Sequence, residues 1–159
     1  MTYDEILTRA RSAIGHGITY HLGHGGLHPA DPLPSRDGQC DCSGFVAWVL
    51  GRSRNPATAP KLPAWPWWLS TDSVFADANG ANVLFTKLDH PVPGCLAVYA
   101  DWKDPDGKHH EGHIAVVADP AKHTVVDCSD SGHGVTEHVQ PVFWSGHHPV
   151  TFCQLKAAA

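Results

Sequence analysis

Residues 41–46 read Asp41-Cys42-Ser43-Gly44-Phe45-Val46, a stretch in which a polar loop turns into an apolar helix. Apolar side chains then recur at helical spacing until Gly51 ends the pattern, which predicts a short buried helix. Cys42 falls in its first turn, where unpaired backbone N–H groups and the positive end of the helix dipole stabilise an anion. The sequence therefore predicts a nucleophilic thiolate at Cys42.

A histidine heads an apolar strand in Gly112-His113-Ile114-Ala115-Val116-Val117. This strand and residues 124–128 flank a five-residue turn, 119–123, so we expect an antiparallel hairpin. An odd-length turn places odd-numbered positions of both strands on one face, which puts Asp127 across from His113 or one diagonal step away. The predicted set is Cys42 as nucleophile, His113 as general base and acid, and Asp127 as the residue that orients His113, with Ser129 and His133 as alternatives to Asp127.

The stretch around Cys42 resembles the nucleophile motif of the NlpC-type cysteine peptidases, a papain-like family that cuts peptide bonds in bacterial peptidoglycan. Residues 17–23, Gly-Ile-Thr-Tyr-His-Leu-Gly, are similar to its Gly-x-x-Tyr-x-x-Gly segment. Residues 93–96, Pro-Gly-Cys-Leu, resemble its Pro-Gly-Asp-Leu strand, with Cys95 in place of the aspartate. The resemblance implies that Tyr20 borders the cleft beside Cys42, and that Asp127 stands where the family has a third, variable polar residue, commonly a histidine.

The implied function is a cysteine peptidase or amidase that hydrolyses peptidoglycan stem peptides, with the γ-D-glutamyl link to the diamino acid as the expected bond. Asp41 and Ser43, on either side of the nucleophile, are candidates for substrate contact, although Ser43 is equally typical of a helix start. No cofactor or metal is expected. A papain-like amidase or acyltransferase that acts on a non-wall amide, and a catalytically inactive wall-binding module, are the alternatives.

A metal-binding hydrolase is a further alternative because the chain has 13 histidines. Several gather in His109-His110-Glu111-Gly112-His113, and another pair stands at 147–148. The zincin motif, His-Glu followed by two residues and a second His, is missed by one position. Two histidines separated by two residues also suit a helix better than the start of a strand. We therefore rank this class below the cysteine hydrolase.

Length and charge indicate a single domain over residues 1–159. A chain of 159 residues can bury about 70% of its unfolded surface. A net charge of −5 argues against nucleic acid or an anionic membrane as a partner. No stretch reaches the roughly 20 apolar residues of a membrane span, so membrane insertion is not expected.

The N-terminus lacks the pattern of a secretory signal. A wall substrate would then require delivery to the periplasm or cell wall by a phage or a secretion system, or earlier loss of a leader. An effector would add an immunity or delivery protein to its partners.

Helical and strand patterns follow in order along the chain. Thr2 to Glu5 has the spacing of a capping box, and an apolar stripe that includes Ile14 continues to Gly15. A short helix is expected at 69–78, and a loop at 53–66. Trp65-Pro66-Trp67-Trp68 is expected to form a packed corner of a loop rather than a surface on which sugar rings stack. Apolar runs predict strands at 96–100, 113–118, 124–128, 134–139 and 150–155. The fold class is α+β and papain-like, with N-terminal helices packed on one face of an antiparallel sheet of about five to six strands.

Five cysteines, an odd number without regular spacing, do not indicate a disulfide framework. Cys40 and Cys42 are too close in sequence for an easy disulfide, so Cys40 is expected to be structural or incidental. The remaining three, Cys95, Cys128 and Cys153, lie in strand-like apolar contexts where cysteine packs as a small hydrophobe.

Overall fold

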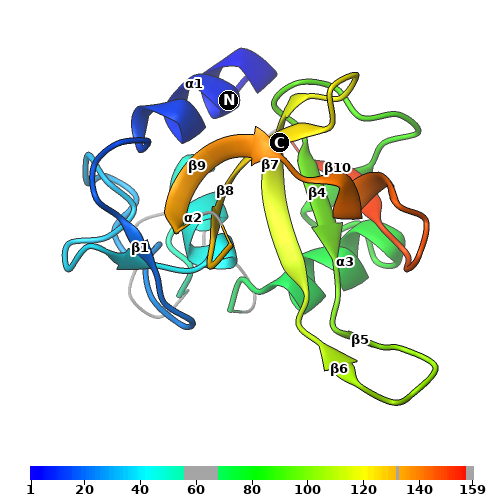
Figure 1. Ribbon diagram of the computed structural model, residues 1–159. Coiled ribbons are helices and arrows are strands. Elements are labelled where there is room, and N and C mark those ends of the chain that lie inside the picture. Colours follow the sequence, from blue (N-terminus) through cyan, green and yellow to red (C-terminus); the bar gives the residue numbers. More distant parts are fainter. Residues whose placement is uncertain (56–67, 132, 157–159) are drawn as a thin grey trace.

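A six-stranded antiparallel sheet organises the chain in the computed structural model, which describes residues 1–55, 68–131 and 133–156 (Figure 1). The strand order is β3-β10-β4-β7-β8-β9. The strands are β3 (Phe85–Lys87), β4 (Leu96–Tyr99), β7 (His113–Asp119), β8 (Thr124–Ser129), β9 (Gly134–Val139) and β10 (Thr151–Leu155). The last of these, β10, enters the sheet between β3 and β4 and pairs with both.

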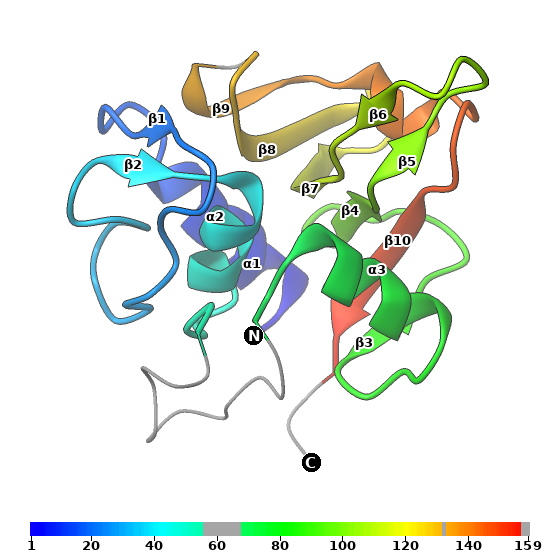
Figure 2. The same ribbon diagram turned by 90° about the horizontal axis from the view of Figure 1, so that it is seen from below.

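In the described part of the chain, three α-helices pack on one face of this sheet (Figure 2). They are α1 (Tyr3–Ser12), α2 (Cys42–Val49) and α3 (Thr71–Asn79). On β7, Ile114 and Val116 join the core beneath the helices, whereas Ala115 and Val117 join a smaller cluster on the other face. Phe143 of the 3-10 helix η2 (Pro141–Trp144) belongs to that second cluster. The structure confirms the predicted α+β class.

Capping residues set where the helices begin. Thr2 caps α1 with the predicted capping box, but α1 ends at Ser12, so Ile14 lies beyond the helix and is exposed. Ser70 caps α3, which therefore begins two residues later than predicted. The N-cap of α2 is Asp41 and Cys42 is the first residue of the helix, so Cys42 lies in the first turn as predicted.

In the β7–β8 hairpin, odd-numbered residues of the two strands share a face as predicted, although the turn is shorter than expected. Thr124 pairs with Asp119, so the turn spans only residues 120–123 and is one residue shorter than expected. An irregularity in the ladder between Val117 and Asp119 compensates, because Val116 pairs with Val126 and the residue numbers of that pair again have an even sum. Odd-numbered positions of the two strands therefore share a face.

Two short strand pairs stand outside the main sheet, and the sequence did not predict them. The strands β1 (Thr19–Tyr20) and β2 (Gln39–Cys40) pair in parallel. The hairpin of β5 (Trp102–Lys103) and β6 (His109–His110) projects from the body of the molecule (Figure 1). Strands of two residues are too short for a period of two to be recognised, and the three-residue β3 was missed for the same reason.

Part of the predicted 53–66 loop, residues 56–66, and Trp65 to Trp67 of the tryptophan-rich stretch lie outside the described residues. None of the helices in the described part of the chain has the length and apolar character that crossing a membrane requires.

Candidate active site

A buried polar network fixes the start of α2. Asp41 Oδ1 accepts from the Gly44 N–H at 2.7 Å, which caps the helix. Asp41 Oδ2 accepts from the Gly23 N–H at 2.7 Å and forms an ion pair with Arg54 Nη2 at 2.8 Å. The same nitrogen donates to Ser43 Oγ at 2.7 Å. These bonds tie the loop before α2, the first turn of the helix and the segment after it together around Cys42.

Asp41 and Ser43 are buried, and the hydrogen bonds just described engage both of their side chains. They also line a hollow with Cys42, so their contact with substrate stays a prediction. Arg54 was missed at the sequence level. A buried arginine needs a buried carboxylate, but no local pattern links position 54 to position 41.

His113 and Asp127 meet across the hairpin. His113 Nε2 lies 2.6 Å from Asp127 Oδ2. The Asp127 side chain is fully buried, and that of His113 is 12% exposed. In the even-sum register, Asp127 lies one diagonal step from His113, which is one of the two placements predicted. The structure thus places a carboxylate on one nitrogen of the imidazole.

The Cys42 thiol lies within hydrogen-bonding reach of the same ring. Because Asp127 occupies Nε2, the other nitrogen, Nδ1, is left for the sulfur. Burial alone lowers the pKa of His113, but the Cys42 sulfur and the Asp127 carboxylate outweigh it and raise that pKa to about 10. His113 is therefore an imidazolium at neutral pH and presents a proton beside the Cys42 sulfur.

Two adjoining hollows open onto this pair of side chains. The larger, with a volume of about 390 Å³, is lined by His113, Ser129 and Asp130 among others. The smaller, of about 210 Å³, is lined by Cys42 and residues of its buried network. Tyr20 and Glu111 line both, so the hollows form one interrupted groove across Cys42 and His113.

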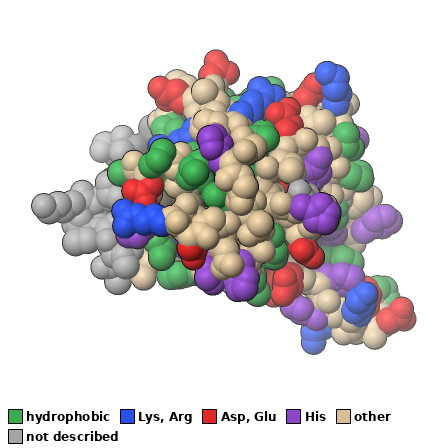
Figure 3. All heavy atoms as spheres, turned by 60° about the vertical axis from the view of Figure 1, so that its left-hand side comes forward, with side chains coloured by type: hydrophobic (Ala, Val, Ile, Leu, Met, Phe, Trp, Pro, Cys, Tyr) green, Lys and Arg blue, Asp and Glu red, His purple; other side chains and the backbone are tan. Residues whose placement is uncertain are grey.

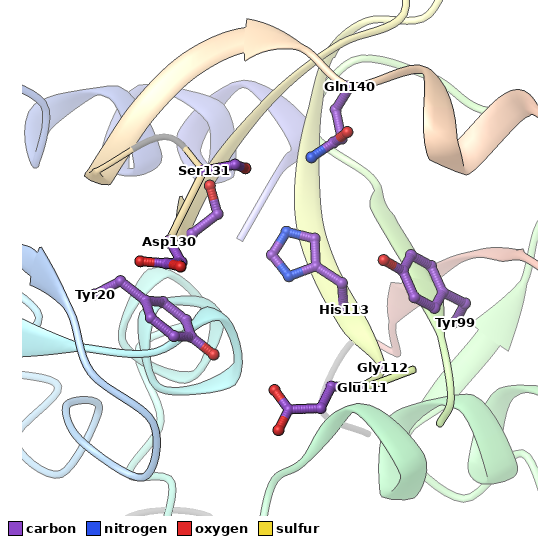
Figure 4. Close-up of a pocket in the computed structure, with 9 residues that line it drawn as sticks. Tyr20, Tyr99, Glu111, Gly112, His113, Asp130, Ser131 and Gln140 are labelled. Carbon is purple, nitrogen blue, oxygen red and sulfur yellow. The ribbon is translucent and has the colours of Figure 1, made fainter. Parts of the chain in front are cut away.

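Two tyrosines flank His113. Figure 4 shows Tyr20 and Tyr99 on opposite sides of the His113 ring. Burial, and next the Cys42 sulfur, raise the pKa of both phenols, that of Tyr99 to about 12. Both therefore remain neutral hydrogen-bond donors at neutral pH. Tyr20 was expected here; Tyr99, which pairs with His113 between β4 and β7, was missed although both strands were predicted.

Two aromatic side chains, Phe143 and Tyr99, form a wall beside the His113 imidazole. The Phe143 ring stacks on His113 with a centroid distance of 5.7 Å, and Tyr99 contacts Phe143 at 5.4 Å. No sequence signal placed Phe143 at the site, because η2 is a single 3-10 turn distant from β7 in sequence. The wall limits the orientations of the ring and helps to bury it.

The two alternatives to Asp127 occupy different positions. Ser129 is buried and lines the larger hollow. His133 is exposed in the turn between β8 and β9. Asp127 makes the short contact with His113, so it remains the best candidate for the orienting role.

The histidine-rich segment 109–113 is divided between the β5–β6 hairpin, which carries His109 and His110, and the groove, which His113 lines. His109 lies 3.0 Å from Asp101, and His110 lies 3.1 Å from Asp104, both at the β5–β6 hairpin. Among residues 1–55, 68–131 and 133–156, no group of three or more His, Cys, Asp or Glu side chains is arranged to hold a metal ion. On the face drawn in Figure 3, histidines are dispersed among acidic and basic side chains.

The architecture matches a solved domain. The P60 domain of antigen MAP1204 from M. avium subspecies paratuberculosis is similar with a TM-score of 0.53 and 19% identity, over 94% of this chain and 91% of that domain. The chain has an NlpC/P60 fold. NlpC1 from Trichomonas vaginalis is also similar, with a TM-score of 0.49 and 13% identity, over 96% of this chain. The match covers 43% of the NlpC1 chain, so this chain spans less than half of that protein's length.

No family model matches the sequence, and no curated protein matches it either. Likeness at 19% identity or below concerns the fold alone. The predicted NlpC-type fold is confirmed, and the chemistry of the site has to be argued from the side chains in the groove.

Proposed function

We propose that the protein is a cysteine hydrolase that cleaves amide bonds through Cys42, His113 and Asp127. One observation carries the proposal: Cys42, at the start of a buried helix, contacts an imidazole whose other nitrogen is held by a buried carboxylate. The pair opens onto a groove, so an extended substrate can reach it. An activated thiol, a base and an orienting group are the components of covalent acyl transfer.

In the proposed reaction, the Cys42 thiolate attacks the carbonyl carbon of the amide. In the first turn of α2, the Gly44 and Phe45 N–H groups already donate to Asp41. The N–H groups of Cys42 and Ser43 are the remaining donors of this turn and stabilise the oxyanion. His113 gives its proton to the leaving amine, which leaves a thioester on Cys42. It then takes a proton from water, which hydrolyses the thioester and releases the acid.

Peptidoglycan stem peptides are the proposed substrate, and the γ-D-glutamyl link to the diamino acid is the proposed bond. The NlpC/P60 fold supports this class, as does the charge of the groove. Glu111 and Asp130 are exposed acidic side chains that line the larger hollow. A carboxylate-lined groove favours a substrate that carries an amino group, as a diamino acid does. The protein would act in the periplasm or cell wall after delivery by a phage or secretion system, and as an effector it would have an immunity or delivery partner.

The direct test is digestion of purified peptidoglycan by the wild type and by Cys42→Ala, with mass spectrometry of the released fragments. We expect the wild type to release fragments with new amine termini and Cys42→Ala to release none. Cys95→Ala, which removes a buried thiol on the other face of the sheet, is the matched control and retains activity. Identical fragments from the wild type and Cys42→Ala would refute the proposal.

Two further outcomes separate the alternatives. Cleavage of soluble peptide amides, or acyl transfer to hydroxylamine, without release of wall fragments would keep the cysteine chemistry and refute the wall substrate. Activity that is lost with a chelator but survives alkylation of thiols would point to the metal-dependent alternative.

A further inference from the structure

Two buried thiols that the proposed reaction does not use lie against each other beside the site. Cys40 belongs to β2, two residues before Cys42, and Cys128 belongs to β8, directly after Asp127. The Cys128 thiol donates to the carbonyl oxygen of Cys40 at 3.1 Å, the Cys40 thiol donates to the carbonyl oxygen of Asp41 at 3.3 Å, and the two thiols interact electrostatically. Both side chains are fully buried in the helix-side core. Two segments separated by 88 positions thus bring their sulfur atoms together.

The surrounding backbone holds this pair in place. Gly25 has φ +81°, and a Cβ atom added there would come within 2.3 Å of the Cys40 sulfur. The loop before β2 therefore passes directly over Cys40, and only a glycine leaves room for the sulfur. Because the loop packs closely on Cys40, Cys40 and the Cys128 thiol on β8 have little freedom to separate.

The other cysteines are poor partners for either member of the pair. Cys42 is two residues from Cys40 and opens into the groove. Cys95 belongs to the cluster on the opposite face of the sheet. Cys153 lies on β10, which β4 and β7 separate from β8 in the strand order. The geometry therefore singles out one pairing among the five thiols.

We propose that Cys40 and Cys128 are a disulfide site, and that the bond forms when the chain folds in the presence of a disulfide oxidant. One cysteine thiolate attacks the oxidant and releases one thiol from it. The second cysteine thiolate attacks the resulting mixed disulfide and releases the other thiol. Two protein thiols are oxidised and one oxidant disulfide is reduced to two thiols. The bond links the segment before Cys42 to the strand that carries Asp127.

The folded pair should react slowly, so the timing of oxidation is part of the proposal. The neighbouring Cys128 thiol, and then burial, raise the pKa of the Cys40 thiol well above its ordinary value. A neutral, buried thiol is a poor nucleophile, so the bond forms while β2 and β8 come together during folding, before packing buries the two sulfur atoms. Once formed, the bond restricts the unfolded chain across about 88 residues and should raise the melting temperature by on the order of 10 °C.

The test refolds reduced, denatured protein in a glutathione redox buffer or in excess reductant, blocks the remaining thiols and maps cross-linked peptides. Trypsin leaves Cys40 and Cys42 on one peptide, 37–52, and Cys128 and Cys153 on another, 123–156. The mapping therefore uses Cys42→Ala, and fragmentation of the second peptide assigns the bond to Cys128 or Cys153. This experiment needs no substrate, so its result is independent of the proposed reaction.

We expect a Cys40–Cys128 cross-link in most molecules refolded with oxidised glutathione, together with the rise in melting temperature. Cys128→Ala should abolish both, whereas Cys95→Ala should retain both. Alkylation of Cys40 and Cys128 in full after oxidative refolding would overturn the proposal. A bond to Cys95 or Cys153 instead, or a cross-linked form no more stable than the reduced one, would also overturn it. The mapping in Cys42→Ala decides the pairing even if Cys128→Ala does not fold.

Discussion

Asp127→Asn is the substitution that tests the geometry of the site most directly. It preserves the shape of a fully buried side chain but removes the carboxylate that lies 2.6 Å from His113 Nε2. A hydrogen bond to a charged group contributes about 1.5–3 kcal/mol. If that energy favours the imidazolium, its loss lowers the pKa of His113 from about 10 by roughly one to two pH units. The same energy in the transition state corresponds to a loss of about 10- to 150-fold in kcat/KM.

The two readouts are NMR titration of the His113 ring and the rate of amine release from peptidoglycan. The ring resonance is assigned by its absence in His113→Ala, so the titration needs no substrate. Asp119→Asn, the same substitution at the last residue of β7 in the same hairpin, is the control and should leave both readouts unchanged. If the His113 ring of Asp127→Asn still titrates near the wild-type value and the rate stays within about twofold, Asp127 does not orient the histidine.

Three further predictions follow from the same contacts. His113→Ala should lower the hydrolysis rate by about 10²- to 10⁴-fold, whereas His16→Ala, at an exposed position, should have no effect. Arg54→Met should destabilise the protein by about 3–5 kcal/mol in urea unfolding, because it leaves the buried Asp41 carboxylate without its cation; Arg36→Met, at an exposed ion pair, is the control, and equal losses in both would contradict the argument. The pKa of His113 is higher in the folded protein than its ordinary value of 6.5, so its contribution to stability is complete below pH 6.5 and is lost as pH rises to about 10. Unfolding free energies measured across that range should fall with pH, and Asp127→Asn should shift the loss to lower pH.

The start of α2 and the side chains that share a face of the β7–β8 hairpin could be predicted from the sequence because both depend on local patterns. An aspartate before an apolar helical stripe fixes where α2 begins, and the period of two along β7 and β8 fixes which side chains share a face. Odd-numbered residues of β7 and β8 still share a face although the turn was one residue shorter than predicted, because the irregularity in the ladder after Val117 compensates. Burial of Ile114 and Val116 on the helix side leaves little freedom for a shifted register.

The remaining parts of the site depend on contacts between distant segments. The ion pair of Arg54 with Asp41 and the stacking of Phe143 on His113 join residues that no short-range pattern relates. Tyr99 is an intermediate case. Its strand was predicted, but its place beside His113 follows only once β4 is known to pair with β7.

The position of β10 has a consequence for the way the protein is made. Its five residues fill the space between β3 and β4, although these two strands end at Lys87 and Tyr99 and β10 begins only at Thr151. Until Thr151–Leu155 have been synthesised, the edges of β3 and β4 that face β10 have no partner, and open edges invite pairing with other chains. The sheet is complete only after β10 has been synthesised, so the groove assembles late, and products truncated before β10 are prone to aggregate.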